Sequence, residues 1–191
     1  MDTPLKSAKG RRAADPVPPF GYYSMARRQL EGARRIDLTY GDDARRKTDT
    51  CMQFLFGWSL EGYLKAYLAG QGVEQPALIR IVHNLEEALR EAVARGLAFP
   101  WIGRVRLAVH HLHPGHRGLY YRYRPQHPDG TDKTFSLILP DLAFDALDAL
   151  DEAVFLSIQE EINVDERRLG QAPTLAWRGV ARPSEWRPRG P

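Results

Sequence analysis

The chain has 191 residues, a single cysteine and a formal net charge of +3. This length favours one domain with a sizeable core, and one cysteine excludes a disulfide framework within the chain, which fits a cytoplasmic protein. No apolar run approaches the about 18 residues that cross a bilayer, and no apolar segment follows the basic N-terminus, so we expect neither a membrane span nor a secretory signal. Cys51 stands in the apolar run CMQFLFGWSL, which predicts a buried small hydrophobic residue.

Arginine dominates the basic residues, with 22 arginines against 5 lysines. Arginine binds phosphate bidentately and stacks on bases, so this composition is compatible with nucleic-acid binding, although a GC-rich genome would also produce it. The chain has no glycine-rich phosphate loop, so no nucleotide cofactor of the P-loop or Rossmann kind is expected, and we expect no cofactor at all.

The first half of the chain predicts a tail followed by helices. Residues 1–18 are polar, basic and proline-containing, which is typical of a flexible tail. Apolar residues recur at helical spacing over 19–38 and over 42–69, the second helix being capped by Asp42 or Asp43 and ended by Gly70. A third helix is expected over 83–97.

The second half predicts a short helix, a hairpin and a long helix. The short helix begins near Pro100 and stops at Pro114-Gly115. The β-branched and aromatic segments 119–125 and 134–139 flank turn residues and predict a β-hairpin, and a last helix follows Pro140. The fold class is therefore all-α, an antiparallel up-and-down bundle of four to five helices with a small hairpin insertion, spanning 19–167. The segment 168–191 is a second tail, in which Trp177 and Trp186 are candidates to dock on the domain or anchor a partner.

Three pieces of the sequence together resemble the HEPN domain family (higher eukaryote and prokaryote nucleotide-binding). They are FLFGWSLEGYLKAYLAGQG at 54–72, IVHNLEEALREAVARGL at 81–97 and LYYRYRP at 119–125, and the resemblance covers roughly residues 20–165. It implies a helical bundle that is often a homodimer. It also implies either a metal-independent ribonuclease of a toxin–antitoxin, phage-defence or stress system, or a non-catalytic binding module.

The family's usual catalytic motif is an arginine followed four to six residues later by a histidine. Arg80 lies too close to His83 for this spacing, whereas Arg106 and His111 fit it, as do Arg104 and His110. A histidine transfers protons near neutral pH and an arginine stabilises phosphate charge, so Arg106 and His111 are the candidate catalytic pair. On a helix they would point about 140° apart, so they would converge across a dimer interface or where the helix unwinds before Pro114.

The same stretch allows two other interpretations. His110, His111, His113 and His116 could ligate a metal, but Pro114 interrupts them and no cysteine or H-E-x-x-H motif accompanies them, so we expect no native metal site. A phosphate-binding surface would use the alternating basic and aromatic residues of the predicted strand. Its candidate residues are Arg104, Arg117, Tyr121, Arg122 and Arg124. A half-buried edge strand with packed tyrosines and solvated arginines is the alternative.

Two further features lie outside that stretch. Glu61 and Lys65 are an i, i+4 pair, either exposed or buried in the bundle, and His83 before Asn84 is expected to cap or pack a helix start.

Two functions stay open. The chain is either an RNA endonuclease using Arg106 and His111, with an antitoxin as protein partner, or a dimerising module that binds a partner protein, nucleotide or RNA.

Overall fold

Six helices make up the regular structure of the described residues, which in this computed structural model are 17–47, 49–122, 129–130 and 136–168. Their bounds are α1 Pro19–Lys47, α2 Asp49–Gly70, α3 Gln75–Ile81, α4 Leu85–Ala94, α5 Ile102–Arg117 and α6 Pro140–Arg168. The expected all-α class is confirmed. Among the described residues, no helix has the length and apolar character needed to cross a membrane.

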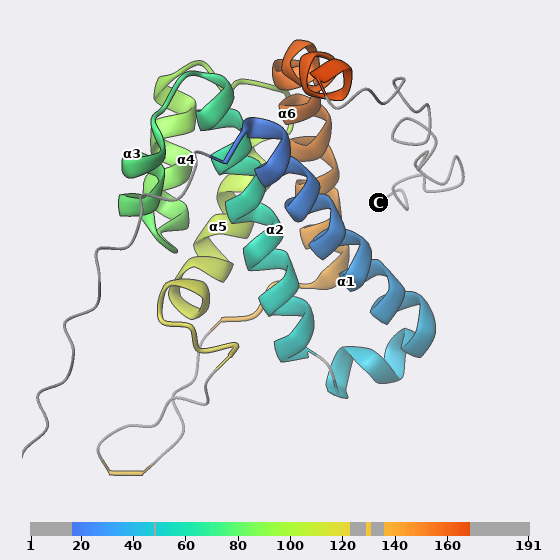
Figure 1. Cartoon of the computed structure of the whole chain (residues 1–191). Coiled ribbons are helices and arrows are strands. Elements are labelled where there is room, and N and C mark those ends of the chain that lie inside the picture. Colours follow the sequence, from blue (N-terminus) through green and yellow to red (C-terminus); the bar gives the residue numbers. More distant parts are fainter. Residues whose placement is uncertain (1–16, 48, 123–128, 131–135, 169–191) are drawn as a thin grey trace, which may run out of the picture.

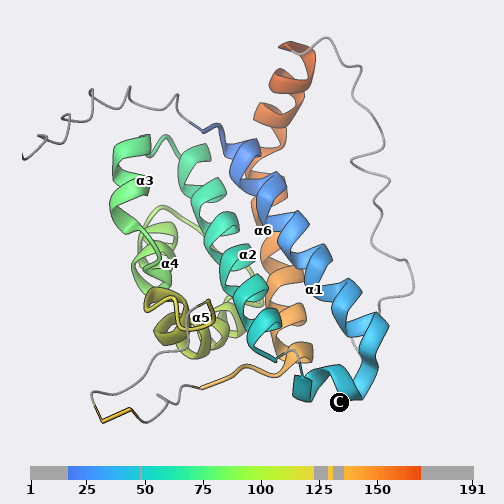
Figure 2. The ribbon, with the colours of Figure 1, turned by 60° about the horizontal axis from the view of Figure 1, so that its bottom comes forward.

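Helix α2 is the centre of the bundle. It lies between α1 and α6 on one side and α3, α4 and α5 on the other (Figure 1). A helix in this position is apolar on most of its circumference, and its largest fully buried side chains form the middle of the core. They are Met52, Phe56, Leu60, Tyr63, Leu64 and Leu68. Seen from the turned view, α1 and α6 run along the same flank of α2 (Figure 2).

Small residues bring α1 and α2 close together. A Cβ on Gly62 would lie 2.8 Å from Ala26 Cβ, so only glycine fits at this crossing. The Ser59 hydroxyl donates to the Ala26 carbonyl at 3.0 Å, which satisfies a buried polar group within the contact.

Several predicted boundaries were wrong. Helix α1 continues past Asp42 and Asp43 to Lys47, so neither residue caps the second helix. Helix α3 was not predicted, and α5 continues through Pro114 to Arg117 instead of stopping there.

Cys51 is exposed, not buried, because it lies in the first turn of α2 and the buried positions begin at the next residue.

The predicted β-hairpin is not supported. Residues 119–122 form turns and 136–139 have no regular structure, while the rest of the two predicted strands lies outside the described residues. The segment before α6 is instead fixed to α2 by the Gln53 side chain. Its amide donates to the Ile138 carbonyl at 2.8 Å and its oxygen accepts from the Ile138 N–H at 3.1 Å.

Candidate acid–base site

A cluster of buried and partly buried charged and aromatic side chains lies where α2, α5 and the turn between α3 and α4 meet. Trp58, Glu61 and Lys65 are spaced three and four residues apart, so they share one face of α2. His83 comes from the α3–α4 turn, and His116 comes from the last turn of α5. Three segments far apart in sequence therefore contribute to one site.

Glu61 is the hub of this cluster. Its Oε2 lies 2.9 Å from His83 Nδ1 and 2.6 Å from His116 Nε2, and its Oε1 accepts a hydrogen bond of 2.6 Å from Lys65 Nζ. The residue is only 4% exposed. A buried carboxylate is stable only when it is paired and hydrogen-bonded, and both oxygens of Glu61 meet that condition.

The surroundings keep Glu61 ionised. Burial on its own would raise the pKa of Glu61, but the hydrogen bond from His116, the charge and hydrogen bond of Lys65 and the hydrogen bond from His83 outweigh it. Together they lower the pKa of Glu61 from 4.5 to about 2. The carboxylate is therefore negative at neutral pH and can stabilise positive charge on either imidazole.

Three aromatic rings pack on one another, and two of them contact the carboxylate. Trp58 packs edge-on against His83 and His116, with ring centroids 5.1 and 5.5 Å apart, and the two imidazoles are 5.3 Å from each other. The Trp58 Nε1 is buried and has no hydrogen-bond partner among the described residues. These contacts fix both imidazole planes.

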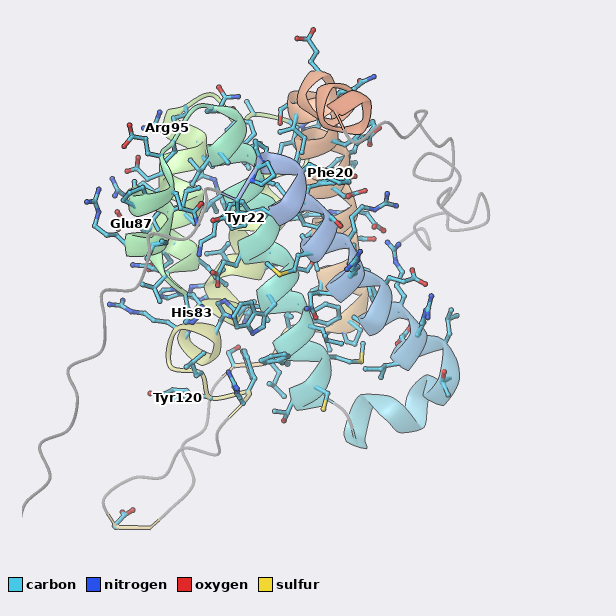
Figure 3. The ribbon with its side chains drawn as sticks, viewed as in Figure 1. Phe20, Tyr22, His83, Glu87, Arg95 and Tyr120 are labelled. Atoms are coloured by element: carbon cyan, nitrogen blue, oxygen red, sulfur yellow. The ribbon has the colours of Figure 1, made fainter. Side chains whose placement is uncertain are left out.

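The two histidines differ in their access to solvent. The His116 side chain is 1% exposed, whereas the His83 side chain is 22% exposed. Figure 3 shows His83 beside the end of α5, on the side of the bundle formed by α3, α4 and α5. Because Nδ1 of His83 is held by Glu61, its Nε2 is the nitrogen left for a ligand, and no hydrogen bond to it occurs within the described ranges.

Local backbone features place the two histidines. Val82, directly before His83, has φ 47°, a conformation that is unfavourable for a β-branched residue and costs about 1–3 kcal/mol. Asn84, directly after it, caps α4 by accepting from the Glu87 N–H at 3.2 Å. His116 reaches Glu61 only because α5 continues through Pro114.

Gly57 leaves the space that the His116 ring occupies. An added Cβ would lie 2.5 Å from His116 Nδ1, too close for any real contact. We expect Gly57→Ala to lower the free energy of unfolding by about 2 kcal/mol, measured by urea denaturation, because crowding a packed site outweighs the better helix propensity of alanine. Gly103→Ala is the matched control. Its Cβ would have no neighbour within 4 Å, so we expect no loss of stability, and an equal loss in both variants would contradict the packing argument.

The predicted catalytic pair does not come together within one copy of the chain. Arg106 lies in a groove between α4 and α5 with Glu86, Leu89 and His110, whereas His111 Nδ1 lies 2.6 Å from Ser136 Oγ, in the segment before α6. The unwinding expected near Pro114 is absent, because residues 102–117 form one helix. Arg106 and His111 therefore point toward different neighbours.

The predicted phosphate-binding residues are also separated. Arg104 forms an ion pair with Asp145 and lies over the Trp101 ring, 4.3 Å from its centroid. Tyr121 is 7% exposed and packs against Gly115, while Arg117 and Arg122 are exposed. The tyrosine packs from a turn, not from the edge strand of the alternative interpretation. Arg124 lies outside the described residues.

The four histidines proposed as an alternative metal site do not converge. The His110 and His111 rings pack on each other, His113 Nε2 lies 3.7 Å from Glu86 Oε2, and His116 turns to Glu61. A different set, Glu61, His83 and His116, has ligand atoms that all lie within 4.8 Å of one another and could hold a cation. Lys65 already balances the Glu61 charge, however, and both imidazoles are at hydrogen-bond distance from one carboxylate oxygen. We therefore interpret the cluster as a hydrogen-bonded acid–base network.

No match to a family model, to a curated protein or to a solved structure was found for this chain. The resemblance to the HEPN family thus rests on the three sequence pieces quoted above. The function has to be argued from the site itself.

Proposed function

We propose that this chain is a HEPN-like, metal-independent RNA endonuclease of a toxin–antitoxin or defence system, in which His83 is the acid–base group. The observation that carries the proposal is the contact of a buried, ionised Glu61 with Nδ1 of a partly exposed His83. A carboxylate on one imidazole nitrogen orients the ring and stabilises its protonated form, so the other nitrogen can exchange a proton with a substrate. The family resemblance and the arginine content suggest RNA as that substrate.

The reaction that suits such a centre is attack by the RNA 2′-hydroxyl on the adjacent phosphate. His83 Nε2 accepts the 2′-hydroxyl proton as the new oxygen–phosphorus bond forms. The 5′-oxygen then leaves and takes a proton back from the imidazolium, so the products are a 2′,3′-cyclic phosphate and a 5′-hydroxyl. Glu61 stabilises the imidazolium between these two steps, and His116 and Lys65 keep Glu61 ionised.

The test of this function uses two matched oligonucleotides in excess EDTA. One is RNA throughout, and the other has a single 2′-deoxy nucleotide at the cleavage position mapped with the first. We expect the RNA to yield cyclic phosphate ends and the substituted oligonucleotide to stay intact at that position, since the nucleophile is missing. Cleavage of both would contradict a 2′-hydroxyl mechanism, and cleavage of neither would favour the second candidate function.

The second candidate is a non-catalytic, dimerising module that binds RNA, a nucleotide or a partner protein. The specific observation in its favour is that both Glu61 oxygens are engaged, so the network would serve to hold α2, α5 and the α3–α4 turn together. The α4–α5 groove, with a volume of about 390 Å³, offers such a module a surface on which Arg90, Arg106 and His110 surround Leu89 and Val93. This candidate predicts binding without turnover.

A further inference from the structure

A second cavity lies among α2, α3 and α4 and has a volume of about 410 Å³. Its apolar surface comes from Leu68 of α2, Val73 of the α2–α3 connection and Ala77 and Ile81 of α3. Its polar residues are Arg80, Asn84, Glu87, Glu91 and Arg95. The volume is within the range of sites for small organic molecules, and the lining combines apolar side chains with a larger share of polar and charged ones.

Only some of the charged residues around this cavity form ion pairs. Arg90, whose side chain is not part of the lining, bonds Glu87 at 2.8 Å and Glu91 at 3.2 Å, so it offsets one of the two acidic charges. Arg80 and Arg95 have no ion pair within the described ranges of the chain. Figure 3 shows Glu87 and Arg95 on the flank that α3 and α4 form. The cavity is left with two guanidinium groups that have no anionic partner there.

We propose that this cavity binds an organic anion with an apolar body, such as a medium-chain or aromatic carboxylate. The apolar body would lie against Leu68, Val73 and Ile81, and the anionic group would take charge-assisted hydrogen bonds from Arg80 and Arg95. This site is separate from the cluster around Glu61, and the inference does not depend on the proposed ribonuclease activity.

The test is a fluorescence titration with 8-anilinonaphthalene-1-sulfonate, which combines an aromatic body with one anionic group. We expect saturable binding of one probe per chain, and a dissociation constant raised about tenfold or more in Arg80→Gln/Arg95→Gln. The matched control is Arg28→Gln/Arg35→Gln, which removes two exposed arginines of α1 and should change the constant less than about twofold. Circular dichroism of each variant serves as the check that it is folded.

Competition experiments distinguish the contribution of the anionic group from that of the apolar body. We expect decanoate to displace the probe, and acetate at the same concentration to leave it bound, because acetate has the anionic group without the apolar body. The proposal is overturned if the probe does not bind, if both double variants weaken it equally, or if acetate competes as well as decanoate.

Discussion

We expect Glu61→Gln to lower the free energy of unfolding at pH 7 by about 3 kcal/mol, measured by urea denaturation. The substitution keeps the shape of the side chain but removes the negative charge. It leaves the Lys65 ammonium, whose side chain is only 12% exposed, without its counter-charge at 2.6 Å. Removing one partner of a buried pair costs about 3–5 kcal/mol because the other charge stays desolvated.

Two variants control this experiment. Glu31→Gln breaks an i, i+4 pair with Arg35 that is exposed on α1, and we expect a change below about 0.5 kcal/mol. Glu61→Gln/Lys65→Met removes both charges of the buried pair, so we expect it to be more stable than Glu61→Gln alone. If Glu61→Gln and Glu31→Gln had the same small effect, the buried network would not contribute to stability as described.

The difference in stability between the natural chain and Glu61→Gln should disappear in acid. The folded protein holds the pKa of Glu61 at about 2, against an ordinary value of 4.5, so the unfolded chain binds the proton first as the pH falls. The stabilisation is thus fully present above about pH 5 and is lost as the pH falls toward 2. A pKa difference of this size corresponds to about 3 kcal/mol.

The measurement is a series of urea unfolding curves for both proteins between pH 6 and pH 2. Other carboxylates also titrate in this range, so only the difference between the two proteins reports on Glu61. We expect that difference to be largest at pH 6 and to approach zero near pH 2. A difference that stays constant over the whole range would mean that Glu61 is not held ionised by its neighbours.

The sequence predicted the long helices well because their apolar residues recur over several turns. It missed α3, which has only seven residues and a proline in its first turn, too short for a periodic signal. The predicted hairpin is not supported within the described residues, where β-branched and aromatic residues pack in turns and irregular segments. Tyr121 lies in a turn and Ile138 in a segment without regular structure, yet both are buried.

The candidate site was predictable only in part. The four-residue spacing of Glu61 and Lys65 places them on one face of a helix, and the sequence left open whether that face is buried. His83 and His116 lie 22 and 55 positions from Glu61, so their convergence depends on how α2, α5 and the α3–α4 turn pack. The Arg106 and His111 spacing, in contrast, was visible in the sequence, but the two residues contact different neighbours.

The most direct test of this account compares two variants in one assay: His83→Ala, and Arg106→Ala/His111→Ala, each shown to be folded by circular dichroism. Both are incubated with the RNA oligonucleotide in excess EDTA beside the natural chain. Because an acid–base group contributes about 100-fold or more to such a reaction, we expect His83→Ala to lose at least that factor. We expect the double variant to keep most of its activity. Full activity of His83→Ala together with loss of activity in the double variant would contradict this account. That result would assign catalysis to Arg106 and His111.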